Sequence, residues 1–150
     1  MKDRYLIVGT SRSGKSTLAK KINGVYLDIF DYVEAYLQDA NLSQSEPNIE
    51  LLKKPYEMLC KDLGNGKAWD VLEIASDFPE IFIPKIISLS KPKPTIIFCD
   101  CPLSICLDRN LKSLRHVPDN ILVAQACYDQ EFFQNLAHSL DTKLIVVNTA

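Results

Sequence analysis

Hydrophobic residues along the chain form short continuous runs that alternate with stretches of helical spacing. The continuous runs predict five strands, at residues 5–8, 25–27, 69–75, 95–99 and 143–147. The stretches between them predict helices over residues 15–22, 31–40, 49–63, 78–89, 103–114 and 118–140. Apolar strands that alternate with helices form parallel sheets covered on both faces. The pattern therefore predicts a single α/β domain with a five-stranded, mainly parallel sheet and helices on both faces.

The composition narrows the class of protein without identifying a reaction. The chain has 150 residues, 47% of them hydrophobic and 24% charged, and its 17 basic and 19 acidic residues give a net charge of −2. These values are typical of one globular domain and do not favour a nucleic-acid-binding protein, which is usually basic. No apolar run reaches the roughly 18 residues that span a bilayer, and the first residues do not resemble a signal peptide. The five cysteines form no CxxC pair, which favours reduced thiols in a cytoplasmic protein.

One motif of the chain is highly specific. Residues 9–16 read GTSRSGKS and match the phosphate-loop pattern GxxxxGK[ST], between a predicted strand and a predicted helix. Backbone N–H groups of such a loop surround nucleotide phosphates, Lys15 is expected to reach the β- and γ-phosphates, and Ser16 is expected to hold Mg²⁺. The sequence thus predicts ATP and Mg²⁺ as cofactors. The residues expected to bind the nucleotide here are Gly9, Thr10, Ser11, Arg12, Ser13, Gly14, Lys15, Ser16 and Thr17.

Acidic residues follow the second and third predicted strands, at the edge where parallel sheets bind their ligands. Glu73 is expected to help Ser16 arrange Mg²⁺, and Asp77 is a less favoured candidate for the same role. A kinase that phosphorylates a hydroxyl also needs a carboxylate that orients the attacking O–H group or accepts its proton. Asp28 and Asp31 are the candidates, and the choice between them stays open because Asp31 could equally be the N-cap of the next helix.

A basic segment late in the chain is the candidate for a lid over the phosphates. Arg109, Lys112 and Arg115 are spaced about one helical turn apart, so a helix would place them on one face. Such a face could neutralise the charge that develops during phosphoryl transfer and exclude water. The alternative is a solvated helix face without a ligand. Asn148, at the end of the last predicted strand, is a further candidate for contact with the nucleotide.

The segments around this lid resemble P-loop kinases related to polynucleotide kinase. Residues 95–110, TIIFCDCPLSICLDRN, are similar to the strand, turn and arginine-bearing helix of that family. Residues 116–121 with Gln125 resemble the start of the helix that follows its lid. The resemblance implies that Arg109 belongs to the lid, together with Lys112 or Arg115.

The resemblance also bears on the acceptor. It implies that Asp31 matches the family's Asp after the second strand, but Glu34 stands where that family often has an Arg that holds an acceptor phosphate. Asp28, Asp31 and Glu34 are instead similar to the acidic residues at this place in shikimate kinase, although residues 53–56 read KKPY and lack its acceptor-carboxylate Arg motif. Adenylate kinase is a third similar family, but this sequence lacks its long glycine-rich loop pattern and its multiple arginines.

The reaction class follows from these observations together. The chain has no NKxD motif for a GTPase switch, and motor-like ATPases are generally longer. We therefore expect a P-loop kinase domain over residues 1–150, with an acceptor-side region at about 31–66 and a lid at about 109–118, that phosphorylates a hydroxyl of a small molecule. Residues 25–84 contain four basic and twelve acidic side chains, which favours a neutral or cationic acceptor over nucleic acid. The alternatives are a polynucleotide 5′-hydroxyl kinase and a non-catalytic ATP-binding regulatory module.

Overall fold

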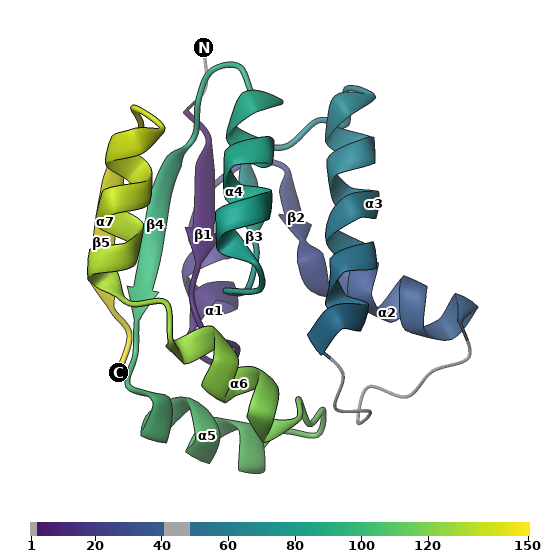
Figure 1. Cartoon of the computed structure of the whole chain (residues 1–150), viewed down its shortest axis with the longest axis vertical. Coiled ribbons are helices and arrows are strands. Elements are labelled where there is room, and N and C mark those ends of the chain that lie inside the picture. The colour runs from purple at the N-terminus through teal and green to yellow at the C-terminus, as the bar shows by residue number, and fades with distance from the viewer. Residues whose placement is uncertain (1–2, 41–48) are drawn as a thin grey trace.

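Short, fully apolar runs of the sequence become the strands of one parallel sheet. The computed structural model of the protein describes residues 3–40 and 49–150. The sheet has five strands in the order β2-β3-β1-β4-β5, and every neighbouring pair is parallel (Figure 1). The strands are β1 (Tyr5–Val8), β2 (Tyr26–Asp28), β3 (Val71–Glu73), β4 (Thr95–Asp100) and β5 (Leu144–Asn148). The predicted five-stranded sheet is confirmed, and it is parallel throughout.

Helices cover both faces of this sheet, as predicted. They are α1 (Lys15–Ala19), α2 (Ile29–Asp39), the 3₁₀ helix η1 (Ile49–Leu52), α3 (Lys53–Gly64), α4 (Pro79–Ser88), α5 (Leu103–Leu111), α6 (Asp119–Ala126) and α7 (Gln130–Ser139). In Figure 1, α4 and α7 lie in front of the sheet and α1 lies behind it. Leu6 and Ile96 pack into the core under α3, α4 and α7, whereas Ile7 and Ile97 pack against Ala19 of α1. Within the described ranges, no helix has the length and hydropathy needed to cross a bilayer.

The prediction is wrong for the longest helix. Residues 118–140 are predicted as one helix, but they form α6 and α7 with a break at residues 127–129. Asp129 has an extended backbone, with φ −100° and ψ −175°, and its side chain accepts a hydrogen bond from Phe132 N at 3.0 Å. This N-cap starts a new helix, which brings Phe133 to 4.7 Å from Phe98 of β4, measured between ring centroids.

The register of the sheet aligns the carboxyl ends of neighbouring strands. Ile7 of β1 and Asp28 of β2 both lie beside Glu73 of β3. Farther along the same edge, Asp100 of β4 lies beside Asn148 of β5. Because the phosphate loop follows β1 directly, the fold gathers this loop, two carboxylates and Asn148 along one edge of the sheet.

Asp129→Ala removes the side chain that caps α7, and we expect it to lower the free energy of unfolding by about 1 kcal/mol. Asp129→Ser keeps an oxygen at the same place and is the matched control, with a loss at most about half as large. Denaturant unfolding of the three proteins measures the difference. Equal stability of the two variants would show that the cap does not stabilise α7.

Candidate active site

The phosphate loop connects β1 to α1 with a backbone that its glycines allow. Gly14 has a φ of +98° and directly precedes α1, a conformation that side chains disfavour. A side chain at Gly9 would bring its Cβ to 2.9 Å from the carbonyl oxygen of Cys99 in β4. Glycine at both positions therefore lets the loop curl tightly against the end of the sheet.

Lys15 is buried inside this loop although it carries a charge. The residue is 5% exposed, and Nζ donates a hydrogen bond to the Thr10 carbonyl oxygen at 2.8 Å. An ammonium group has three donors, so one carbonyl leaves capacity for an anionic ligand. Ser13 Oγ in the same loop is also buried, and it has no hydrogen-bond partner among the described residues. These polar groups fit the phosphates of a nucleotide.

Ser16, Tyr26 and Glu73 form a hydrogen-bonded group beside the loop. Ser16 Oγ donates to the Glu73 carboxylate, at 2.9 Å from Oε1 and 3.1 Å from Oε2, and Tyr26 O–H donates to the same Oε1. Burial and the neighbouring Glu73 raise the pKa of Tyr26, so its hydroxyl remains a neutral donor. A serine hydroxyl and a carboxylate are hard oxygen ligands of the kind that Mg²⁺ takes together with water and phosphate oxygens. Ser16 and Glu73 thus fit the metal, and Tyr26 is a residue that sequence reasoning missed.

Asp28 is the N-cap of α2, the role that the sequence analysis considered for Asp31. Its Oδ1 accepts a hydrogen bond from Phe30 N at 3.0 Å, and its Oδ2 lies 3.3 Å from the Tyr26 hydroxyl oxygen. Asp31 lies in the first turn of α2, because the helix begins two residues earlier than predicted, and it is exposed. Burial, and next the charge of Glu73, raise the pKa of Asp28 to about 6.

A second polar group links β3 to the phosphate loop. Gln125 Nε2 of α6 donates to Asp77 Oδ1 at 2.8 Å, and Gln125 Oε1 accepts from Ser11 N at 2.7 Å. The Tyr56 hydroxyl lies 3.1 Å from Asp77 Oδ2 and 2.9 Å from the Ala75 carbonyl oxygen. Burial raises the pKa of Asp77, and the hydrogen bonds from Gln125 and Tyr56 oppose that shift. Sequence reasoning did not name Gln125 as a site residue, although its place in the helix after the lid was a signal.

The segment predicted to form a lid, residues 109–118, contacts the phosphate loop through residues of α5. Arg109 donates to the carbonyl oxygens of Arg12, at 3.1 Å, and of Thr149, at 2.8 Å. The Asn110 side chain donates to the Val117 carbonyl oxygen at 2.6 Å and accepts from Val117 N at 3.1 Å. Asn110, also missed from the sequence, thereby closes the loop between α5 and α6.

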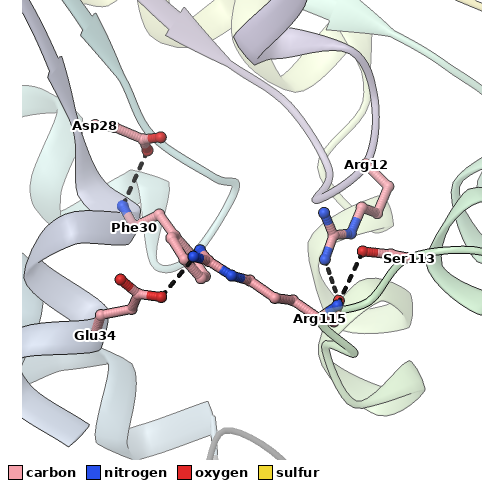
Figure 2. Close-up of polar contacts among 6 residues, drawn as sticks. All are labelled: Arg12, Asp28, Phe30, Glu34, Ser113 and Arg115. Atoms are coloured by element: carbon pink, nitrogen blue, oxygen red, sulfur yellow. Dashed lines mark hydrogen bonds and ion pairs between the residues drawn. The ribbon is translucent and has the colours of Figure 1, made fainter. Parts of the chain in front are cut away.

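Arg115 extends from this loop to the opposite wall of the site (Figure 2). Its guanidinium pairs with Glu34 Oε1 of α2 at 2.9 Å and lies 4.7 Å from the centroid of the Phe30 ring. Its backbone N–H donates to Ser113 Oγ at 3.2 Å, and its carbonyl oxygen accepts from Arg12. Arg115 therefore connects the lid, the phosphate loop and α2.

The structure separates the other predicted lid residue from this group. Lys112 is exposed and pairs with Asp108 at 2.9 Å on the outside of the molecule, because α5 ends at Leu111 and the three basic residues share no single helix face. Lys112 and Asp31 do not line the cleft described below, whereas Asn148 and Arg109 do.

These groups surround one cleft of about 850 Å³. The phosphate loop and Asn148 line one part of it, and α2, η1 and the start of α6 line another. Ligand pockets of proteins occupy roughly 300–1,000 Å³, so this cleft has room for a nucleotide and a small second ligand.

Comparisons with known proteins agree with this arrangement. No protein-family model and no curated protein sequence matches the chain. Among solved structures, gluconokinase from Sinorhizobium meliloti 1021 matches with a TM-score of 0.62 and 11% identity, over 99% of this chain and 83% of that one. Shikimate kinase from Acinetobacter baumannii in complex with shikimate matches with a TM-score of 0.58 and 14% identity, over 100% of this chain and 86% of that one. The chain thus has the fold of P-loop small-metabolite kinases.

Asp28→Asn tests the electrostatic state of this carboxyl. Its pKa is raised on folding from an ordinary value of 3.8, so the folded protein binds the proton more tightly than the unfolded chain does. Asp28 therefore stabilises the fold below about pH 4, and that contribution is lost as pH rises through about 6. Relative to wild type, the Asp28→Asn variant should gain about 1–2 kcal/mol between pH 4 and 7, after allowance for partial exposure.

Denaturant unfolding at pH 4, 5.5 and 7 measures this gain. Asp31→Asn is the matched control, because it makes the same substitution at an exposed carboxylate of the same helix. A difference between the Asp28→Asn variant and wild type that does not change with pH would contradict the raised pKa.

Proposed function

We propose that the protein is an ATP-dependent kinase that transfers the γ-phosphoryl group to a hydroxyl of a small molecule. The observation that carries this proposal is that a half-buried carboxylate, Asp28, lines the same cleft as the phosphate loop. A hydroxyl held by Asp28 would face phosphates held by Lys15 and the loop. The fold shared with gluconokinase and shikimate kinase supports the same reaction class.

In this proposal the phosphate loop binds the nucleotide and its metal. The loop N–H groups and Lys15 hold the phosphates. Ser16 and Glu73 would hold Mg²⁺, which when bound neutralises charge on the phosphate oxygens. Tyr26 keeps the Glu73 carboxylate in place through its hydrogen bond. Tyr26 is therefore a positioning residue for the metal site.

Asp28 is assigned to the acceptor hydroxyl. Phosphoryl transfer passes through a loose transition state, so orientation of the nucleophile contributes more than strong base catalysis. The hydrogen bond from Phe30 N, with the Tyr26 hydroxyl 3.3 Å away on the other oxygen, fixes the direction of the Asp28 carboxylate. Its pKa of about 6 leaves it mostly ionised at neutral pH and able to accept the hydroxyl proton. Asp31 does not receive this role, because it is exposed and does not line the cleft.

Two arginines are assigned to the charge that develops during transfer. Arg109 uses two of its donors on backbone carbonyls, which fixes a guanidinium beside the phosphate loop with donors left for phosphate oxygens. Arg115 approaches from the opposite side, where Glu34 holds it. Such fixed positive groups stabilise the transition state more than the ground state.

The direct test is transfer from γ-labelled ATP with Mg²⁺ to defined acceptors and to a metabolite extract. The defined acceptors are shikimate, gluconate and a 5′-hydroxyl oligonucleotide. Label on a small molecule supports the proposal. Label on the oligonucleotide alone would indicate a polynucleotide kinase instead, and ATP binding without any labelled product would indicate a regulatory module.

Lys15→Ala should lower kcat/KM for transfer by about 100-fold or more, because it removes the buried positive charge of the phosphate loop. Lys20→Ala is the matched control, since Lys20 is exposed near the end of α1 and does not line the cleft. Transfer by the Lys15→Ala variant at the wild-type rate would overturn the assignment of this site.

A further inference from the structure

The part of the cleft opposite the phosphate loop has an apolar wall. This is unexpected, because the side chains that the sequence predicts beside the phosphoryl acceptor are polar. α2 contributes side chains at positions that helical spacing places on one face. The apolar wall consists of Phe30, Val33 and Leu37 from α2, Leu51 and Leu52 from η1, and Ile121 from α6. All but Ile121 are only half-buried, so they keep apolar surface that a ligand can cover.

Arg115 and Asp28 both contact Phe30 of the apolar wall, and their arrangement does not favour an anionic acceptor there. The Arg115 guanidinium reaches this wall, but it is already paired with Glu34 at 2.9 Å and stacked on Phe30. Asp28 adds a second carboxylate at the edge of the wall. An acceptor carboxylate or phosphate would have to displace Glu34 from Arg115 and approach Asp28, a like charge.

A polyhydroxylated acceptor is disfavoured for a different reason. Each hydroxyl that leaves water needs a hydrogen-bond partner, and an unpaired buried hydroxyl weakens binding. Val33, Leu37 and the leucines of η1 offer no such partner through their side chains. Shikimate and gluconate, the acceptors in the names of two structural neighbours, are both polyhydroxylated carboxylates.

We propose that the acceptor of this kinase is a neutral alcohol carried on an apolar body. Its hydroxyl lies at Asp28, and its body covers the apolar wall of α2, η1 and α6. This proposal rests on the proposed kinase function and deepens it by naming the substrate class. The transfer moves the γ-phosphoryl group from ATP to the alcohol oxygen, with ADP as the leaving group and the hydroxyl proton passing to Asp28 or solvent.

The test separates a metabolite extract by reversed-phase chromatography into early polar and late apolar fractions. Each fraction is incubated with the protein, γ-labelled ATP and Mg²⁺. We expect labelled product from late fractions and none from shikimate or gluconate. Label from early fractions alone would overturn this proposal and leave the kinase function standing, whereas no label from any fraction, with ATP still bound, would overturn both.

Val33→Thr keeps the shape of the side chain and adds a hydroxyl to the apolar wall. With the acceptor purified from the active fraction, we expect its KM to rise about 10-fold, with kcat and the Kd for ATP nearly unchanged. Ala35→Ser adds a hydroxyl on the exposed side of the same helix and should leave every constant unchanged. An acceptor KM within twofold of wild type for Val33→Thr would overturn the proposal.

Binding of a neutral apolar fluorophore, N-phenyl-1-naphthylamine, tests whether the apolar wall binds an apolar ligand, without any transfer step. Its fluorescence should rise with wild type and with Ala35→Asp, and the apparent Kd should be at least 10-fold weaker with Val33→Asp. Retained ATP binding would show that the Val33→Asp variant is folded. Equal fluorescence with wild type and Val33→Asp would contradict an apolar subsite, whatever the result for transfer.

Discussion

The parallel register of β1, β2 and β3 is the constraint on which the site depends. Because the three strands end at the same edge, Asp28 and Glu73 become neighbours beside a loop that is built to hold phosphate. Neighbouring carboxylates repel each other, and the Tyr26 hydroxyl, which donates to Glu73 and lies 3.3 Å from Asp28 Oδ2, relieves part of that repulsion. A divalent cation held by Ser16 and Glu73 would relieve more of it, so the charges at this edge favour binding of the metal that the proposed reaction requires.

The walls of the cleft are held with different strength. Gln125 joins Asp77 to the phosphate loop through buried hydrogen bonds, which fixes α6 relative to the sheet. The contact between Arg115 and Glu34 is more exposed, and ion pairs of that kind contribute little to stability. The wall at α6 is therefore held by buried polar contacts, whereas α2 meets Arg115 through a more exposed ion pair and the Phe30 ring.

Local sequence signals predicted the parts of the fold and the site that local physics determines. The phosphate loop and the apolar strands could be predicted, because glycine geometry and burial on both faces act over a few residues. The break before α7 could not, since one capping side chain at Asp129 outweighed a helical pattern that continues on either side. The choice between Asp28 and Asp31 turned on where α2 begins. Tyr26 acts through a partner 47 residues away, a separation at which spacing carries no signal, and the partner of Gln125, 114 residues away, could not be predicted although the resemblance included Gln125 itself.

The electrostatics of Asp28 and the apolar wall support the same acceptor. Burial is the largest cause of the raised pKa of Asp28, and at about 6 this pKa leaves the group mostly ionised at neutral pH. An apolar acceptor body displaces water from Phe30 and Val33 beside that carboxylate, whereas a polar or charged one would bring water with it. A general base works best when its pKa lies near the working pH, so a pKa of about 6 suits Asp28 to accept the hydroxyl proton. Covering the wall would bind the apolar body of the acceptor, and Asp28 would orient its hydroxyl, so one cleft would supply both the selectivity and the group that prepares the nucleophile.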